Sequence, residues 1–150
     1  MRRFKSGPLP LPRFDDDKAP INRADLVFYD VDPSGPSYQA RIYFNAPDAD
    51  YKTPRDESYG FGGWFTVFGH GGCFGDDERH CEVPDEVDPF DLRAPRGIPR
   101  QTKAVTVTDA LRRLSGDTFT VTVVPVIATE SGPEATSTLD FRRLRLLTYE

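Results

Sequence analysis

Residues 37–45, SYQARIYFN, alternate between apolar and polar side chains, and this alternation constrains the fold more than any other feature of the chain. In an extended segment successive side chains point to opposite faces, so the even-numbered residues from 38 to 44 share one apolar face. The odd-numbered residues, which include Gln39 and Arg41, share the other face. A period of two is typical of a half-buried β-strand and does not suit an amphipathic helix, whose period is about 3.6.

Five other segments have the apolar alternation or the β-branched and aromatic composition of strands. They are residues 24–31, 62–69, 103–114, 118–128 and 136–149, and the third of them runs from a short strand into a helical turn. Turns separate these segments in a chain that contains 14 Pro and 12 Gly. About six antiparallel strands with one short helix and long loops predict an all-β protein, either an antiparallel β-sandwich or a partly open barrel.

Local features refine this prediction. Aromatic residues fall on both faces of residues 62–69, which predicts a strand that is buried on both faces. Thr108 or Asp109 is expected to cap the helical turn at its start. Pro125 predicts a strand end, a bulge or an edge position. A slip in the apolar alternation after Phe141 predicts a β-bulge.

The composition and the charge of the chain restrict its function. Hydrophobic residues make up 37% of the 150 residues, enough for one domain with a buried core. The formal net charge is −5 and no block of Lys or Arg concentrates positive charge, which disfavours binding to nucleic acid. No apolar run reaches the roughly 18 residues of a membrane span, and none near the start resembles a secretory signal. We therefore expect a cytoplasmic protein without a nucleic-acid or membrane partner, unless a partner exports it.

Residues 1–22 are rich in Pro and polar residues and show no periodicity. We expect an extended arm there, and two interpretations remain open: a disordered tail, or an arm that wraps around a partner. Residues 23–150 are expected to form a single β-sandwich domain. Within it, residues 71–101 form a long connection without a strand pattern, and such connections are commonly functional or internally tied.

All His and Cys residues of the chain, two of each, fall within twelve consecutive positions at the start of that connection. They are His70, Cys73, His80 and Cys81. Thiolate and imidazole are ligands of copper(I) and zinc, and four of them can form a tetrahedral metal site. Glycines between them permit the tight folding that convergence needs. One objection is that His80 and Cys81 are adjacent, so that in an extended segment their side chains point apart.

Three other interpretations of these residues remain open. A disulfide between Cys73 and Cys81 would close a loop of about nine residues and stabilise the fold by about 2.5 kcal/mol, given an oxidising compartment. Alternatively, both cysteines are small buried hydrophobes and His70 hydrogen-bonds a backbone carbonyl. Nucleophilic catalysis by Cys with His would need an orienting Asp or Asn and a pocket. The sequence contains no phosphate-binding loop motif and no G-x-S-x-G nucleophile motif.

Three segments together resemble a known family. They are YQARIYFNAPDADYKTPRDESYGFGGWFTVFGHGGCFGDDERHC (38–81), DPFDLRAPRGIP (88–99) and DTFTVTVVPV (117–126). They are similar to the C-terminal domain that follows the copper-binding central domain in bacterial tyrosinase-like and polyphenol oxidase proteins. The resemblance covers residues 24–128 and includes the four His and Cys residues. It implies an antiparallel β-sandwich that packs over the dinuclear copper site of the oxidase and shields it.

The resemblance implies a non-catalytic, accessory role. Phenol oxidation in that family needs six His on a helical bundle, whereas this chain has two His. A side chain of the shielding domain can plug the substrate entrance, and Tyr59 and Phe61 are the candidates here, with Ser58 where the family has His. A tyrosinase-like oxidase is then the expected partner, and the cluster would assist copper loading. The alternatives are a free-standing metal-binding or disulfide-stapled structural module, with copper or zinc at the cluster, and an enzyme with a mononuclear metal there.

Overall fold

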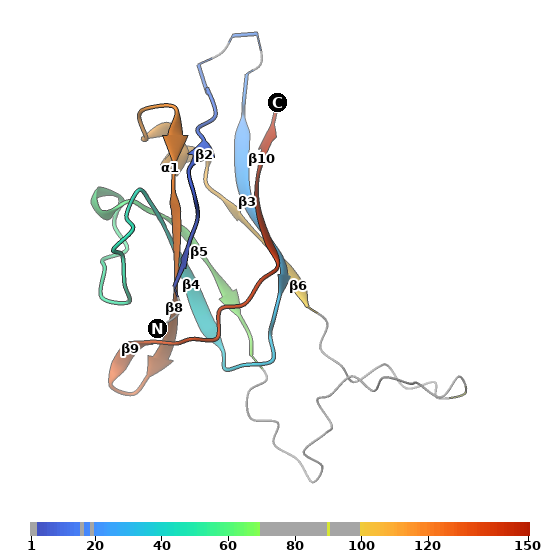
Figure 1. Ribbon diagram of the computed structural model, residues 1–150, viewed down its shortest axis with the longest axis vertical. Helices are drawn as coiled ribbons and strands as arrows, with labels where there is room; N and C mark the ends of the chain where they lie inside the picture. The colour runs from blue at the N-terminus through green and yellow to red at the C-terminus, as the bar shows by residue number, and fades with distance from the viewer. Residues whose placement is uncertain (1–2, 16, 19, 70–89, 91–99) are drawn as a thin grey trace.

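Two antiparallel β-sheets face each other in the computed structural model, which describes residues 3–15, 17–18, 20–69, 90 and 100–150 (Figure 1). The five-stranded sheet has the order β1 (Phe4–Lys5), β8 (Val121–Thr129), β4 (Tyr38–Phe44) and β5 (Phe61–Val67), and β9 (Gly132–Ala135) also pairs with β8. The three-stranded sheet has the order β10 (Arg143–Tyr149), β3 (Arg23–Val31) and β6 (Gln101–Thr106). A separate ribbon pairs β2 (Leu9–Pro10) with β7 (Thr118–Phe119).

The prediction of an all-β protein with antiparallel sheets is confirmed. Every strand pair among the described residues is antiparallel, and the sheets do not close into a barrel. In the same residues the helices are one short α-helix, α1 (Thr108–Arg112), and one 3₁₀ turn, η1 (Glu57–Tyr59). Neither is long and apolar enough to cross a membrane.

The main core lies between the two sheets and follows from the alternation along the strands. Phe28 on β3 and Phe65 on β5 are buried, and their ring centroids lie 4.8 Å apart. Ala40 and Ile42 on β4 are fully buried in the same cluster, as the alternation predicts. Full burial stabilises the fold by about 1.5–3 kcal/mol for each large apolar side chain, so this layer holds the sheets together.

A smaller cluster lies on the outer face of the five-stranded sheet. Tyr43 on β4 is fully buried there, and Ala49 and Tyr51 from the loop after β4 pack on the same cluster. The Tyr43 hydroxyl donates a hydrogen bond to the carbonyl of Thr53, with an oxygen–oxygen distance of 2.8 Å. Burial raises the pKa of Tyr43. Arg41 on the same strand donates to the carbonyl of Tyr51 at 3.1 Å, so two side chains of β4 attach the polar loop to the sheet.

Strand β5 is not buried on both faces, so the prediction for residues 62–69 was wrong. Phe65 is buried, but Trp64 is 49% exposed and Phe68, just beyond the strand, is 73% exposed. The reason is that the two faces of β5 have different surroundings. Phe65 packs against Phe28 of the three-stranded sheet, whereas Trp64 pairs with Arg41 on the outer face of the five-stranded sheet.

The predicted cap of α1 was also wrong. The residue at the N-cap is Val107, which has no side-chain hydrogen bond, so neither Thr108 nor Asp109 caps the helix. Thr108 Oγ1 instead accepts a hydrogen bond from the backbone N–H of Ala24 at 2.9 Å. This contact links α1 to β3, a tertiary partner that local sequence does not reveal.

The last strand begins later than predicted, at Arg143 rather than at residue 136. The slip after Phe141 is not a bulge, because β10 pairs in regular register with β3 over its whole length. Leu139 and Phe141 precede the strand and pack against the main core. They belong to the segment that crosses from the five-stranded sheet to the three-stranded sheet (Figure 1).

Pro125 lies inside β8, opposite a gap between two partner strands. Strand β1 pairs with β8 up to Val123, and β9 pairs with it from Val126 onward. The Pro125 carbonyl accepts a hydrogen bond from the Thr136 N–H on this side at 3.2 Å. The missing N–H of proline therefore interrupts no regular ladder on this side. The prediction of a strand end, a bulge or an edge was wrong, because β8 is an inner strand of the sheet and its pairing with β4 continues in register through Pro125.

The residues predicted as an arm, 1–22, contribute two short strands to the fold. Phe4 pairs with Val123 on β8, and Leu9 pairs with Phe119 on β7. Phe4 and Leu9 also pack against the main core. In Figure 1 this segment, in dark blue, runs along β8, so part of the arm completes the five-stranded sheet.

Candidate functional site

The four residues of the His and Cys cluster, His70, Cys73, His80 and Cys81, lie outside the residues that the structure describes. The copper or zinc site, the disulfide and simple packing therefore stay predictions. Among the described residues, no group of three or more His, Cys, Asp or Glu could hold a metal ion. The candidates that the structure does place are the two aromatic residues Tyr59 and Phe61.

The 3₁₀ turn η1 carries Tyr59, and the local sequence explains why it forms. Asp56 precedes the turn in an extended conformation, and its carboxylate accepts a hydrogen bond from the backbone N–H of Ser58 at 2.9 Å. Asp is favoured at such positions because its short side chain satisfies an N–H that the turn leaves without a backbone partner. The hydroxyl and the N–H of Ser58 together lower the pKa of Asp56, which keeps the capping carboxylate charged at neutral pH.

Gly60 ends the turn in the left-handed conformation, with φ of 79°. Its N–H donates to the carbonyl of Glu57 at 2.9 Å, and its own carbonyl accepts from the N–H of Phe44 at 2.7 Å. A Cβ atom at this position would clash with the carbonyl oxygen of Phe44. Backbone conformation and close approach to β4 therefore both require glycine here.

The structure separates the two candidate aromatic residues. Tyr59 is 53% exposed, whereas Phe61 begins β5 and packs edge-on against Tyr43 with ring centroids 5.6 Å apart. Such aromatic pairs add about 0.5–1.5 kcal/mol beyond the burial of area. Phe61 therefore anchors the end of the turn, and Tyr59 is the ring that a partner can reach.

An ion pair connects the turn to α1. Arg113 Nε, just after the helix, lies 3.1 Å from Glu57 Oε2, and both side chains are substantially exposed. Exposed pairs of this kind stabilise a fold by about 0–1 kcal/mol. The pair therefore orients η1 against α1 more than it stabilises the protein.

Trp64 is an exposed aromatic residue that sequence analysis did not select. It pairs with Arg41 across β5 and β4, on the outer face of the sheet. A register shift at Gly62 places Phe61 on this same outer face, although the two aromatic residues are three positions apart. The Gly62-Gly63 pair could have indicated this register shift from the sequence, since glycine within a strand often marks a bulge.

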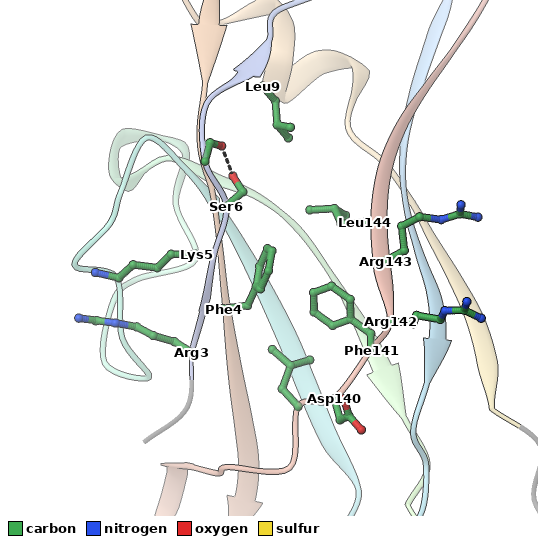
Figure 2. Close-up of a pocket in the computed structure, with 12 residues that line it drawn as sticks. Arg3, Phe4, Lys5, Ser6, Leu9, Asp140, Phe141, Arg142, Arg143 and Leu144 are labelled. Carbon is green, nitrogen blue, oxygen red and sulfur yellow. Dashed lines mark hydrogen bonds between the residues drawn. The ribbon is translucent and has the colours of Figure 1, made fainter.

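A groove of about 710 Å³ opens between the arm and the segment that leads into β10 (Figure 2). Its floor is apolar: Phe4 and Phe141 meet edge-to-face with centroids 4.9 Å apart, and Leu144 lies above them in the view. The two walls come from opposite ends of the chain. Sequence analysis missed the groove because no local pattern joins residues so far apart.

Basic side chains surround this groove without entering its floor. Figure 2 shows them on both walls, directed away from the two Phe rings: Arg3, Lys5, Arg142 and Arg143. The one carboxylate in the lining, Asp140, lies 3.3 Å from Arg100 Nη2 and is thereby paired. Arg3 donates hydrogen bonds to the carbonyls of Asp48 and Ala49, and Arg142 lies 3.7 Å from Asp30. Arg143 therefore stays available to an occupant that is apolar on the side facing the groove and acidic on the other.

Comparisons with known proteins add no family to these observations: no family model, no curated protein and no solved structure matches the chain. The described residues therefore define its class by fold alone, as an all-β protein with two facing antiparallel sheets.

Proposed function

We propose that this chain is a non-catalytic accessory domain that covers the active-site entrance of a tyrosinase-like copper oxidase, with Tyr59 as the side chain that enters it. One observation carries the proposal: a half-exposed phenol ring sits on a turn that backbone hydrogen bonds hold at both ends. The sequence resemblance supplies the class of partner, and the turn supplies the side chain. Phe61 supports the turn through its contact with Tyr43.

A phenol ring suits this role because the pocket of such an oxidase receives phenols. Tyr has only two side-chain torsions, and Asp56 and Gly60 fix the backbone of η1 on either side. Little conformational entropy is therefore lost when the ring enters a pocket. A ring in the pocket excludes substrate, so the oxidase stays inactive until the domain dissociates or is removed.

The test starts with a search for a gene, next to the gene for this chain, that encodes the six-His central domain of a tyrosinase-like oxidase, and uses the copper-loaded product of that gene. Adding the purified chain should inhibit diphenol oxidation, followed by the absorbance of the quinone. Tyr59→Ala should raise the inhibition constant by about tenfold or more, because a buried aromatic anchor dominates an interface of this kind. Tyr59→Phe keeps the ring and should inhibit within about threefold of the parent chain.

Tyr149→Ala is the matched control, since Tyr149 is 46% exposed on a different element, β10. It should leave inhibition unchanged. Equal inhibition by the parent chain and Tyr59→Ala would exclude Tyr59 as the inserted side chain. A chain that neither binds nor inhibits the oxidase would refute the accessory function as a whole.

The His and Cys cluster would have one role in an accessory domain and another in the alternative, a free-standing structural module. As part of an accessory domain, His70, Cys73, His80 and Cys81 would hold copper and assist its loading into the oxidase. In a free-standing structural module, the same residues would hold zinc or copper, or Cys73 and Cys81 would form a disulfide. The observation that favours either role is the gathering of every His and Cys into twelve positions of the chain.

Metal analysis and thiol counting on protein purified without chelator distinguish these roles. A metal site predicts about one equivalent of copper or zinc and loss of that metal in Cys73→Ser. A disulfide predicts no free thiol in the unfolded, unreduced chain. Metal content that Cys73→Ser leaves unchanged would exclude the cluster as the metal site.

A further inference from the structure

The outer edge of β10 is a surface that the proposed function does not use. Strand β10 pairs with β3 on one side, and on its other side it pairs with no strand among the described residues. Unpaired backbone N–H and C=O groups along such an edge can accept a strand from another polypeptide. The groove lies at the start of this edge, because Arg143 and Leu144 are part of its lining.

The side chains of β10 alternate between the core and the solvent. Leu144 and Leu146 pack against the main core, whereas Arg143 and Arg145 are exposed on the outer face of the sheet. A strand added to this edge would place its own side chains directly opposite the two leucines and the two arginines of β10. Cross-strand pairs of opposite charge, and pairs of apolar residues, are the stabilising combinations.

The positive charge of this edge is not neutralised by neighbouring carboxylates. Arg143 stacks on the ring of Tyr29, with the guanidinium carbon 4.7 Å from the centroid, and keeps its charge. Arg145 has no ion pair among the residues that the structure describes. Asp30, the carboxylate next to Tyr29, lies 3.7 Å from Arg142 Nη1. The edge is therefore basic on a chain whose net charge is −5.

We propose that the edge of β10 binds an extended segment of a partner protein in which apolar and acidic residues alternate, as an added strand. The apolar side chains of that segment lie over Leu144 and the floor formed by Phe4 and Phe141. Its carboxylates lie on the outer face, opposite Arg143 and Arg145. The groove volume of about 710 Å³ is within the range of about 300–1,000 Å³ for binding pockets. This inference does not depend on the role of Tyr59.

A second copy of this chain fits the same edge less well. An antiparallel pairing of two β10 strands centred on Leu144, beside the groove, would place Arg143 of one copy opposite Arg145 of the other. Like charges opposite each other in a sheet are destabilising. Charge complementarity therefore favours an acidic partner segment over self-association.

The probe is a fluorescein-labelled ten-residue peptide that alternates Glu with Val and Ile, and its binding is followed by fluorescence anisotropy. Arg143→Glu combined with Arg145→Glu should weaken binding by about tenfold or more, because two attractions become repulsions. The same peptide with Lys in place of Glu should bind the double variant more tightly than the parent chain. Raising the salt concentration should weaken binding of the acidic peptide, since exposed charges are screened.

Lys52→Glu combined with Arg55→Glu is the matched control, because it changes the net charge equally at two exposed residues of the loop after β4. It should change the affinity by less than about twofold. Hydrogen exchange adds a readout of strand pairing: the peptide should protect amides within residues 143–149. Thermal melting verifies that both double variants are folded.

Four outcomes would overturn the proposal. Equal affinity for the Glu and Lys peptides would remove the charge argument. Binding without protection of the amides of β10 would exclude an added strand. No saturable binding would mean that Arg143 and Arg145 only keep this edge from aggregating. A concentration-dependent dimer of the parent chain that protects the amides of residues 143–149 would make a second copy the occupant.

Discussion

Replacement of Gly60 by alanine should destabilise the protein by about 2–4 kcal/mol. The φ of 79° at this position costs an L-residue about 1–2 kcal/mol. The added Cβ would also clash with the carbonyl oxygen of Phe44. Relief of this clash stretches the hydrogen bond from the Phe44 N–H to the Gly60 carbonyl, now 2.7 Å long, at a cost of about 1–2 kcal/mol. The sum of the two contributions gives the range of about 2–4 kcal/mol.

Urea denaturation measures this difference. Trp64 is the one tryptophan of the chain and lies on β5, directly after the turn, so its fluorescence reports on this region. A loss of about 2–4 kcal/mol corresponds to a fall in melting temperature of about 4–16 °C for a domain of this size. Because Gly60 also ends η1, the same variant should weaken any binding that depends on Tyr59.

Two other glycines separate backbone strain from steric clash. Gly116 has φ of 94° and no atom within 4 Å of an added Cβ, so Gly116→Ala should show the strain alone, about 1–2 kcal/mol. Gly7 has an ordinary φ and equally open surroundings, and Gly7→Ala should be neutral or slightly stabilising. If Gly60→Ala were no less stable than Gly116→Ala, the close approach of Gly60 to β4 would not matter and the reasoning would be refuted.

Three further predictions concern stability. Phe28→Ala, at a fully buried ring, should lower the free energy of unfolding by about 3–5 kcal/mol. Phe68→Ala, at a ring that is 73% exposed, should change it by less than about 0.5 kcal/mol. Urea titrations that gave similar values for the two variants would contradict the assigned core. The hydrogen bond from Arg23 lowers the pKa of the buried Asp25, so the stability from this carboxylate is present above about pH 4 and is lost as the pH falls further. Asp25→Asn should therefore flatten the acid limb of a plot of unfolding free energy against pH, and an unchanged limb would rule out the pair as its source. Burial raises the pKa of Tyr38 to about 12, so stability should fall as the pH rises from about 10 towards 12. Tyr38→Phe should reduce this fall without abolishing it, because burial also raises the pKa of Tyr43. The Tyr38 hydroxyl has no hydrogen-bond partner among the described residues, so the variant should be at least as stable at neutral pH, as measured by thermal melting.

The candidate site could be predicted only in part. The family resemblance led to both Tyr59 and Phe61, because a side chain that plugs a phenol pocket should be an aromatic ring on an exposed loop. It could not divide their roles, since that division depends on a register shift at Gly62 that turns Phe61 towards Tyr43. The His and Cys cluster, which the sequence singled out most strongly, lies outside the described residues and stays a prediction.

The sequence by itself determined the all-β class, the antiparallel strands and the buried face of β4, because a period of two is a local property that every residue of a strand shares. Only the tertiary structure decided which face of β5 the other sheet covers, and hence why Trp64 is half exposed, and which strands are edges, and hence why β10 has an unpaired side. It also placed Phe4 against Phe141, which forms the floor of the groove. Burial and edge exposure depend on neighbours that distant segments supply, and no local pattern contains those neighbours.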